Sequence, residues 1–181
     1  MVKIMKSKLT YDISLVAFFT TLLVISSWFT IPFAIPFTLQ TLVIFICILV
    51  LDLKKSILIL TIYFILGIIG IPVFNSFQSG IGVFVGPTGG FLIGFIPMII
   101  ISTLLKKSFV KKSNNILLFL SLFIGLICCY IISVFWYTLV YDTTENLINV
   151  LSVLILPFII PDIIKIIIAM LIAKRFSILN H

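Results

Sequence analysis

LPFIIPDIIKIIIAMLIAK, residues 156–174, is an apolar stretch as long as a membrane crossing, and it carries one aspartate and one lysine in its interior. A hydrocarbon layer about 30 Å thick takes roughly 20 apolar residues of helix. The whole chain has this character, because 62% of its residues are hydrophobic and only 9% are charged, which is more apolar surface than a soluble core can bury. The sequence therefore predicts an all-α integral membrane protein that forms a single domain over residues 1–181.

Charged and turn-forming residues divide the chain into six apolar spans, so we expect six transmembrane helices. These spans use nearly the whole chain and leave no segment for a soluble catalytic or DNA-binding domain. The predicted spans are 12–31, 36–53, 56–74, 89–105, 115–141 and 148–173.

The positions of the basic residues predict the orientation of the spans. The connections around 32–36, 75–88 and 142–147 contain no lysine or arginine. Eleven of the twelve basic residues flank the other ends of the spans, namely Lys3, Lys6, Lys8, Lys54, Lys55, Lys106, Lys107, Lys111, Lys112, Lys174 and Arg175. Since basic segments stay in the cytoplasm, both termini are predicted to lie on the cytoplasmic side of the cell membrane. The +7 net charge is therefore explained by the topology and does not indicate a nucleic-acid partner.

Asp162 and Lys165 are the charged residues inside the sixth span. A charge deep in a bilayer costs about 3 kcal/mol on insertion scales, so such residues usually face a cavity or a partner. The spacing of three places both side chains on one side of the helix, about one turn apart. A pair that serves only helix packing is the alternative, but leucines would serve packing at lower cost. We therefore predict that both residues line a ligand pocket.

Two prolines, Pro157 and Pro161, precede this pair. Proline lacks an N–H, so we expect the helix to kink or restart at Pro161, which would place Asp162 and Lys165 in the first turn of a half-helix. Broken helices of this kind bind solutes in transporters. Counting back from Lys174 at about 1.5 Å per residue places Lys165 roughly 14 Å from the cytoplasmic end, so the pocket is expected to open toward the outside.

The second span adds Thr38, Gln40 and Thr41 at its outer end, after Pro32 and Pro36. The amide of Gln40 both donates and accepts hydrogen bonds and suits a neutral polar ligand. Packing against a neighbouring helix is an open alternative for Gln40. Thr38 and Thr41 are interpreted as helix-packing residues.

The segment GIGVFVGPTGGFLIG, residues 80–94, holds six of the nine glycines. It lacks the lysine of a phosphate-binding P-loop and the preceding strand of a dinucleotide fold. Pro87 divides the segment into two parts with different expected roles. Residues 80–88 are predicted to form an outward loop that closes over a ligand, and Gly90 and Gly94 to form a close-packing face of the fourth span.

The chain has no pattern typical of catalysis or metal binding. Cys47, Cys128 and Cys129 have neither metal-ligand spacing nor a CxxC pair, and His181 is the only histidine. An intramembrane enzyme would need a nucleophile with a base or a pair of acids, and a channel would need a repeated pore-lining pattern. We therefore expect a non-catalytic protein with no cofactor and no metal.

Four ordered motifs resemble the BioY family, the biotin-specific substrate-binding (S) components of energy-coupling factor (ECF) vitamin transporters. The motifs are IPFTLQT at 35–41, LGIIGIPVF at 66–74, GVFVGPTGGFLIGF at 82–95 and PDIIK at 161–165. The resemblance covers the chain from the first to the sixth span. It implies six helices and an outward pocket that is closed by the loops between helices 1 and 2 and between helices 3 and 4.

The resemblance also implies biotin as the ligand and assigns residues to it. Lys165 would meet an anionic or carbonyl oxygen of biotin and Asp162 would accept from a ureido N–H, or these roles would be exchanged or shared. The lid positions that the resemblance implies are Gln78, Ser79, Gly86 and Thr88, with Gln40 as a further ligand-binding candidate.

The family's partners follow from the same resemblance. It implies a transmembrane coupling subunit and two cytoplasmic ATPases, with the coupling subunit docked on a small-xxx-small face of the first helix. That face corresponds here to Ala17 and Thr21. The expected function is biotin uptake; an S component for another vitamin, riboflavin or thiamine, and a stand-alone membrane carrier are the alternatives.

Overall fold

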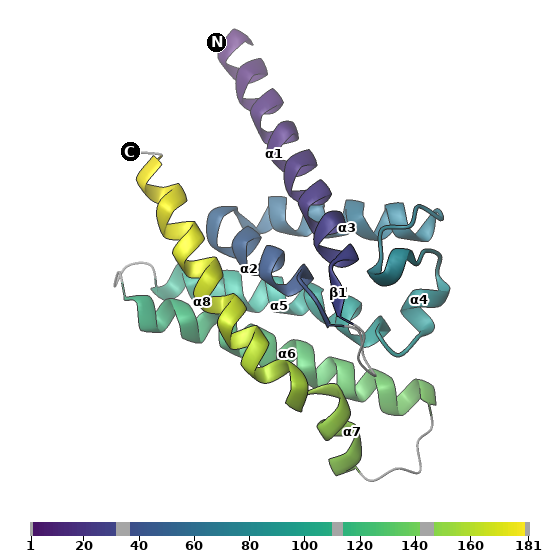
Figure 1. Ribbon diagram of the computed structural model, residues 1–181. Coiled ribbons are helices and arrows are strands. Elements are labelled where there is room, and N and C mark those ends of the chain that lie inside the picture. The colour runs from purple at the N-terminus through teal and green to yellow at the C-terminus, as the bar shows by residue number, and fades with distance from the viewer. Residues whose placement is uncertain (1, 32–36, 110–113, 142–146, 180–181) are drawn as a thin grey trace.

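The computed structural model describes residues 2–31, 37–109, 114–141 and 147–179, and these residues form a helical protein with one short hairpin (Figure 1). The two ends of the chain lie toward the top of Figure 1, and the hairpin, α4 and α7 lie lower in the view. The elements in chain order are α1 (Val2–Trp28), β1 (Thr30–Ile31), β2 (Phe37–Thr38), α2 (Gln40–Val50), α3 (Leu53–Ile68), η1 (Asn75–Phe77), α4 (Gly82–Val85), α5 (Gly89–Phe109), α6 (Asn115–Tyr141), α7 (Leu147–Leu154) and α8 (Leu156–Leu179).

Four helical segments of the described chain are long and apolar enough to cross a membrane. They are Leu9–Trp28, Gly89–Ser108, Asn115–Val140 and Ile148–Arg175. The predicted spans 36–53 and 56–74 correspond instead to the shorter helices α2 and α3, of 11 and 16 residues. The predicted connection at 32–36, most of that at 142–147, and Lys111 and Lys112 lie outside the described residues.

The ends of the predicted spans differ in how well they match the structure. The span 115–141 coincides with α6, so that prediction is confirmed. The span 56–74 was predicted too long, because α3 ends at Ile68 and is followed by Gly70 with a φ of +102°. The amide of Ile71 donates to the carbonyl of Leu66 and that of Gly70 to the carbonyl of Gly67, which is a Schellman motif.

The sixth predicted span consists of two helices, and the break is not where the prolines predicted it. α7 ends at Leu154 and α8 begins at Leu156, so Pro157 falls in the first turn of α8, where proline is tolerated. α8 continues through Pro161, and the predicted restart at that residue is wrong. The environment of neighbouring membrane helices allows proline inside a helix, because other groups satisfy the freed carbonyl.

Glycines bring α5 and α6 into close contact. A Cβ atom at Gly90 would lie 2.7 Å from the Cα atom of Ser133, and one at Gly94 would lie 2.8 Å from the Sγ atom of Cys129. On α6, a Cβ atom at Gly125 would lie 2.9 Å from the carbonyl oxygen of Met98. The prediction that Gly90 and Gly94 form a packing face is therefore confirmed.

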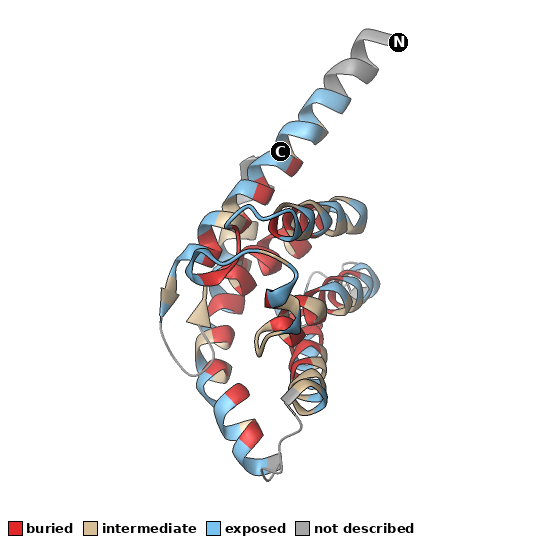
Figure 2. Ribbon diagram, turned by 90° about the vertical axis from the view of Figure 1, so that its right-hand side faces the viewer, coloured by how far each residue is buried: buried red, intermediate tan, exposed pale blue. Residues whose placement is uncertain are grey.

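Buried residues lie on the sides of the helices that face one another, and apolar residues also cover the outer sides (Figure 2). α6 shows this most simply, because its exposed apolar side chains recur every three or four residues along one stripe. Such a stripe is expected for a helix whose outer side faces lipid rather than water. The stripe consists of Ile116, Leu120, Ile124, Ile127, Ile131, Phe135 and Leu139.

Charged side chains hold the helix ends together at the lysine-rich end of the molecule. Lys106, in the last turn of α5, donates to the carbonyl oxygens of Ile48, Leu49 and Leu51 at the end of α2. A cation is favourable there because the carbonyls at a helix C-terminus carry partial negative charge. Lys55, in the first turn of α3, forms an ion pair of 2.6 Å with Asp12 of α1. These contacts join α2 to α5 and α1 to α3.

Candidate ligand-binding site

Asp162 and Lys165 form a buried ion pair on α8, with 2.8 Å between the Lys165 Nζ and Asp162 Oδ1 atoms. They are 2% and 4% exposed. Because the helix restarts at Leu156, the pair lies in its second and third turns rather than in its first. The predicted pairing on one side of the helix is present in the structure.

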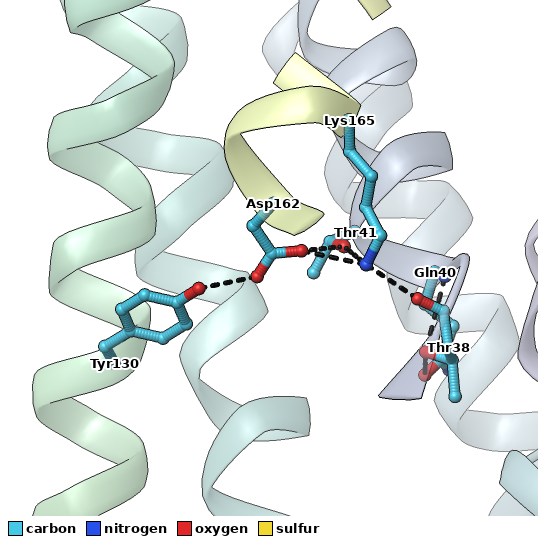
Figure 3. Close-up of polar contacts among 6 residues, drawn as sticks. All are labelled: Thr38, Gln40, Thr41, Tyr130, Asp162 and Lys165. Carbon is cyan, nitrogen blue, oxygen red and sulfur yellow. Dashed lines mark hydrogen bonds and ion pairs between the residues drawn. The ribbon is translucent and has the colours of Figure 1, made fainter. Parts of the chain in front are cut away.

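α2 supplies further polar contacts to this pair (Figure 3). The hydroxyl of Thr41 donates to Asp162 Oδ1 at 2.9 Å and accepts from Lys165 Nζ at 2.8 Å. Lys165 also donates to the carbonyl oxygen of Thr38 at 2.8 Å. Thr41, interpreted as a packing residue, joins α2 to α8 through the charged pair itself, whereas Thr38 contacts Lys165 only through its main-chain carbonyl.

Tyr130 of α6 reaches Asp162 from the other side (Figure 3). Its hydroxyl donates to Asp162 Oδ2 at 2.6 Å. The carboxylate thus accepts from Lys165 and Thr41 on Oδ1 and from Tyr130 on Oδ2. An ionised carboxylate has about four acceptor positions, so one on Oδ2 remains for another donor.

The Lys165 ammonium, in contrast, has no N–H left for a further acceptor. Its three N–H groups donate to the Thr38 carbonyl, the Thr41 hydroxyl and the Asp162 carboxylate, and its Nζ atom lies 3.9 Å from the centroid of the Phe37 ring. An ammonium has three donors and no acceptor. A ligand oxygen can therefore bind Lys165 only by replacing one of these contacts.

Gln40 is held by neighbours of its own. Its Nε2 atom donates to the Tyr63 hydroxyl at 2.5 Å, and its Oε1 atom accepts from the Thr38 hydroxyl at 2.9 Å. Tyr63 is fully buried. Gln40 thus packs against α3 through Tyr63 and also lines the same cavity as Asp162 and Lys165.

The cavity at this site has a volume of about 40 Å³. Ligand pockets for small molecules usually hold roughly 300–1,000 Å³, so a vitamin-sized ligand must open this one. Aromatic rings take up much of its wall, with the Phe91 and Phe158 centroids 5.8 Å apart. The full lining is Thr38, Gln40, Thr41, Asn75, Thr88, Phe91, Leu92, Phe95, Phe158, Asp162 and Lys165.

A second hollow of about 470 Å³ adjoins this cavity, since Asn75 and Thr88 line both. The other predicted lid residues, Gln78, Ser79 and Gly86, line the hollow but not the small cavity. The segment from Gly80 to Thr88 was predicted as a loop, and residues Gly82–Val85 within it form the short helix α4.

Asn75 is 7% exposed, and within the described part of the chain no hydrogen bond of its side-chain amide is seen. The next two residues, Ser76 and Phe77, have φ values of 54° and 59°. A left-handed backbone conformation at a non-glycine residue costs free energy, and residues in this conformation are often found at binding sites. Contacts to α1 hold this turn, because Ser27 donates to the Val73 carbonyl at 2.5 Å and Phe77 stacks on Trp28.

Ala17 and Thr21, the expected docking residues, lie exposed on α1, far along the chain from the charged pair. The Thr21 hydroxyl donates to the Ala17 carbonyl at 2.9 Å. Both residues line a groove of about 600 Å³ that also includes Lys54, Lys55 and Leu58 of α3. The structure therefore places them on an outer surface between α1 and α3 and not in the ligand cavity.

Comparison with known proteins identifies the family of this fold. Residues 2–180 match the model of the BioY family. The chain is 37% identical over 160 residues to the "Biotin transporter BioY" of Thermotoga maritima, covering 88% of this chain and 91% of that protein. The chain belongs to the BioY family. This BioY-family chain is also 36% identical over 174 residues to the "Probable biotin transporter BioY" of Pyrococcus horikoshii, covering 96% and 98% of the two chains.

A solved structure has the same fold. It is described as the "S-component for biotin from an ECF-type ABC transporter", and it superposes with a TM-score of 0.85 at 24% identity, covering 94% of this chain and 93% of the other. The superposition extends over nearly all of the BioY-family chain.

Sequence reasoning missed Asn75 and Tyr130 among the residues at the site, besides Thr38 and Thr41. Tyr130 lies 32 residues from Asp162 in an apolar helix, and the sequence offers no sign that the two meet. Asn75 had a usable signal, because it is a polar residue directly after an apolar span and at the start of the expected lid.

Proposed function

We propose that this protein takes up biotin across the cytoplasmic membrane as the biotin-binding S component of an ECF-type transporter. The observation that carries the proposal is the buried Asp162–Lys165 pair in a cavity lined by polar and aromatic groups, in a chain of the BioY family. Ionisable residues inside membrane helices are usually functional. We infer biotin as the ligand because these relatives are named as biotin transporters.

The contacts of the pair suggest how biotin binds. Asp162 Oδ2 accepts a ureido N–H at its remaining acceptor position, beside the Tyr130 hydroxyl. Lys165 exchanges its contact with the Thr38 carbonyl for an oxygen of biotin. The amide of Asn75, which also lines the cavity, adds a donor and an acceptor.

The segment around the second hollow acts as the lid of this pocket. Gln78, Ser79, Gly86 and Thr88 move with the segment when the small cavity opens to admit biotin, and Gln40 stays in place through its hydrogen bond to Tyr63. Ligand entry from the outside agrees with the location of these residues away from the lysine-rich ends of α5 and α8.

The protein is a single domain with six membrane-crossing helices, with α2 and α3 as the shorter ones and α7 with α8 as the sixth. Both termini are cytoplasmic by the distribution of lysine and arginine. A transmembrane coupling subunit docks on the groove at Ala17 and Thr21, and two cytoplasmic ATPases supply the energy. The protein itself is not an enzyme.

Titration of the purified protein with biotin tests the proposal. We expect saturable binding that is lost in Asp162→Asn and in Lys165→Ala and retained in Lys107→Ala, which removes an exposed lysine outside the site. Competition with riboflavin and thiamine checks the ligand. No saturable biotin binding, or equal binding by all three variants, would contradict the proposal.

A further inference from the structure

Away from the lysine-rich end of the molecule, the sequence has a single basic residue, Lys165. Residues 9–53, 56–105 and 113–164 contain no lysine or arginine. Lys165 is 4% exposed and forms an ion pair with Asp162. No other charged side chain is among the described residues that line the small cavity. Because the two charges of the pair cancel, the cavity offers no net positive charge to an anionic ligand.

The second hollow leads from this cavity to the surface, and its lining is neutral. Asn75 and Thr88 line both the small cavity and the hollow. Gln78, Ser79 and Gly82, which also line the hollow, are exposed. None of the described residues that line the hollow carries a charge. A ligand that is held at the charged pair and extends into the hollow therefore passes from charged groups to neutral groups and water.

The two ends of biotin differ in how they fit these two environments. The ureido group has N–H donors beside a carbonyl acceptor, whereas the side chain of biotin ends in a carboxylate. Asp162 has an acceptor position left on Oδ2, and the Lys165 ammonium lies 2.8 Å from Oδ1, so the pair offers an acceptor beside a donor. The ureido end matches this arrangement.

The carboxylate end of biotin does not match the charged pair. A carboxylate that reaches Lys165 would lie beside the carboxylate of Asp162. It would also add one negative charge to a buried and otherwise neutral site, and a buried charge without a counter-charge is strongly unfavourable. The carboxylate end is therefore expected in the second hollow, where it meets neutral groups and water.

We propose that the site does not recognise the tail of biotin by its charge, and that the protein also binds biotin amides, in which a neutral amide replaces the carboxylate. This inference rests on the proposed function. In the second hollow the side chains of Gln78 and Ser79 both donate and accept hydrogen bonds, so they suit an amide as well as a carboxylate. The hollow has a volume of about 470 Å³ and exposed residues on its lining, which leaves room for a tail extended through an amide bond.

Calorimetric titration of the purified full-length protein with biotin and with biotinamide tests the proposal. We expect the Kd of biotinamide to lie within about fivefold of the Kd of biotin, since the amide loses no ion pair. Removal of a charge that is held by a buried cation would instead weaken binding by roughly 30-fold or more. The two compounds differ only at the end of the tail, so the comparison isolates the contribution of its charge.

A cation added to the second hollow tests the physical reason. Gln78→Lys should raise the ratio of the biotin affinity to the biotinamide affinity about threefold at low salt, and high salt should remove this gain. The ratio cancels any effect of the substitution that both compounds share. Asn149→Lys is the matched control, because it adds the same charge at an exposed position of α7, outside the hollow, and it should leave the ratio unchanged.

The outcomes separate this inference from the proposed function. Binding of biotin with a biotinamide Kd more than fivefold higher would overturn the inference and leave the proposed function intact. An unchanged ratio in a folded Gln78→Lys protein, or an equal rise in Asn149→Lys, would also overturn the inference. Binding of neither compound would overturn both. Thermal unfolding of each variant in detergent confirms that it is folded.

Discussion

Lys165 and Lys106 are two lysines inside apolar helices, and they are stabilised in different ways. Lys165 is 4% exposed and is neutralised by Asp162, with Thr41 and Thr38 completing its contacts. Lys106 is half-buried and meets the carbonyl oxygens that end α2. A fully buried charge needs a counter-charge, whereas a charge near the membrane surface needs only a helix end and access to water.

This difference in contacts indicates a structural role for Lys106 and a ligand-binding role for Lys165. Lys106 joins two helices, and leucines or an uncharged cap elsewhere could replace that role. The Lys165–Asp162 pair is surrounded by further donors and acceptors from α2 and α6, in a cavity, and this is more polar structure than packing requires. The following predictions test this distinction, from the largest expected effect to the smallest.

Removing Lys165 should cause the largest loss. In Lys165→Met the Asp162 carboxylate loses its counter-charge, and breaking a buried pair in this way costs about 3–5 kcal/mol of the free energy of unfolding. The double variant Asp162→Leu, Lys165→Met should recover most of that stability without recovering biotin binding. Thermal unfolding in detergent and biotin titration measure the two effects. Equal stability of the single and double variants would show that the pair is not coupled.

Removing Lys106 should have a smaller effect, and only on stability. Lys106→Met leaves the last carbonyls of α2 without their cation, which should cost about 1–2 kcal/mol. Lys106→Arg should retain most of the stability, because it keeps a cation at the same place. Biotin affinity should stay within a factor of about two in both variants, since neither touches the cavity. A loss of biotin binding comparable with that of Lys165→Met would contradict the distinction between the two lysines.

Asn75→Ala should affect binding without affecting stability. The side-chain amide has no hydrogen bond in the described chain, so its removal breaks no hydrogen bond of the free protein. A lost hydrogen bond to biotin should weaken binding about tenfold, which corresponds to about 1.4 kcal/mol. Asn149→Ala, the same substitution at an exposed position of α7, is the matched control. A large fall in melting temperature without a change in affinity would assign Asn75 a structural role instead.

Tyr130→Phe should have the smallest effect. It removes the donor to Asp162 Oδ2 and keeps the ring, so stability should fall by about 1 kcal/mol or less. Biotin affinity should fall only a few-fold, because Thr41 and Lys165 still hold the other carboxylate oxygen. Val134→Ala on the same helix is a packing control for the stability measurement. A loss of binding as large as that of Lys165→Met would show that Tyr130 is itself a principal ligand contact.

Much of the fold could be predicted from the sequence where composition alone decides it. α6 coincides with its predicted span because no proline and no charged residue interrupts it. The two boundaries that were wrong depend on local backbone chemistry. Gly70 ends α3 early by adopting a left-handed conformation, and α8 passes through Pro161 because proline is tolerated within it.

The candidate site was only half visible in the sequence, for a physical reason. Asp162 and Lys165 stand out because charges are rare in membrane spans. Thr41 and Tyr130 do not stand out, since a hydroxyl costs little in a helix and gains its role only through contacts with residues 121 and 32 positions away. Such contacts depend on which distant helices pack together, and the local pattern of residues in the sequence does not reveal that packing.

The spacing of Asp162 and Lys165 has a consequence for the insertion of the chain into the membrane. The two charges lie three residues apart on one helix and pair within it, so their neutralisation depends on no other segment. α8 can therefore enter the bilayer as a helix with no net charge in its centre, before α2 and α6 have closed around it. The pairing thus lowers the free-energy cost of placing these two charges in the bilayer within a single helical segment during biogenesis. Assembly of the pocket can follow afterwards.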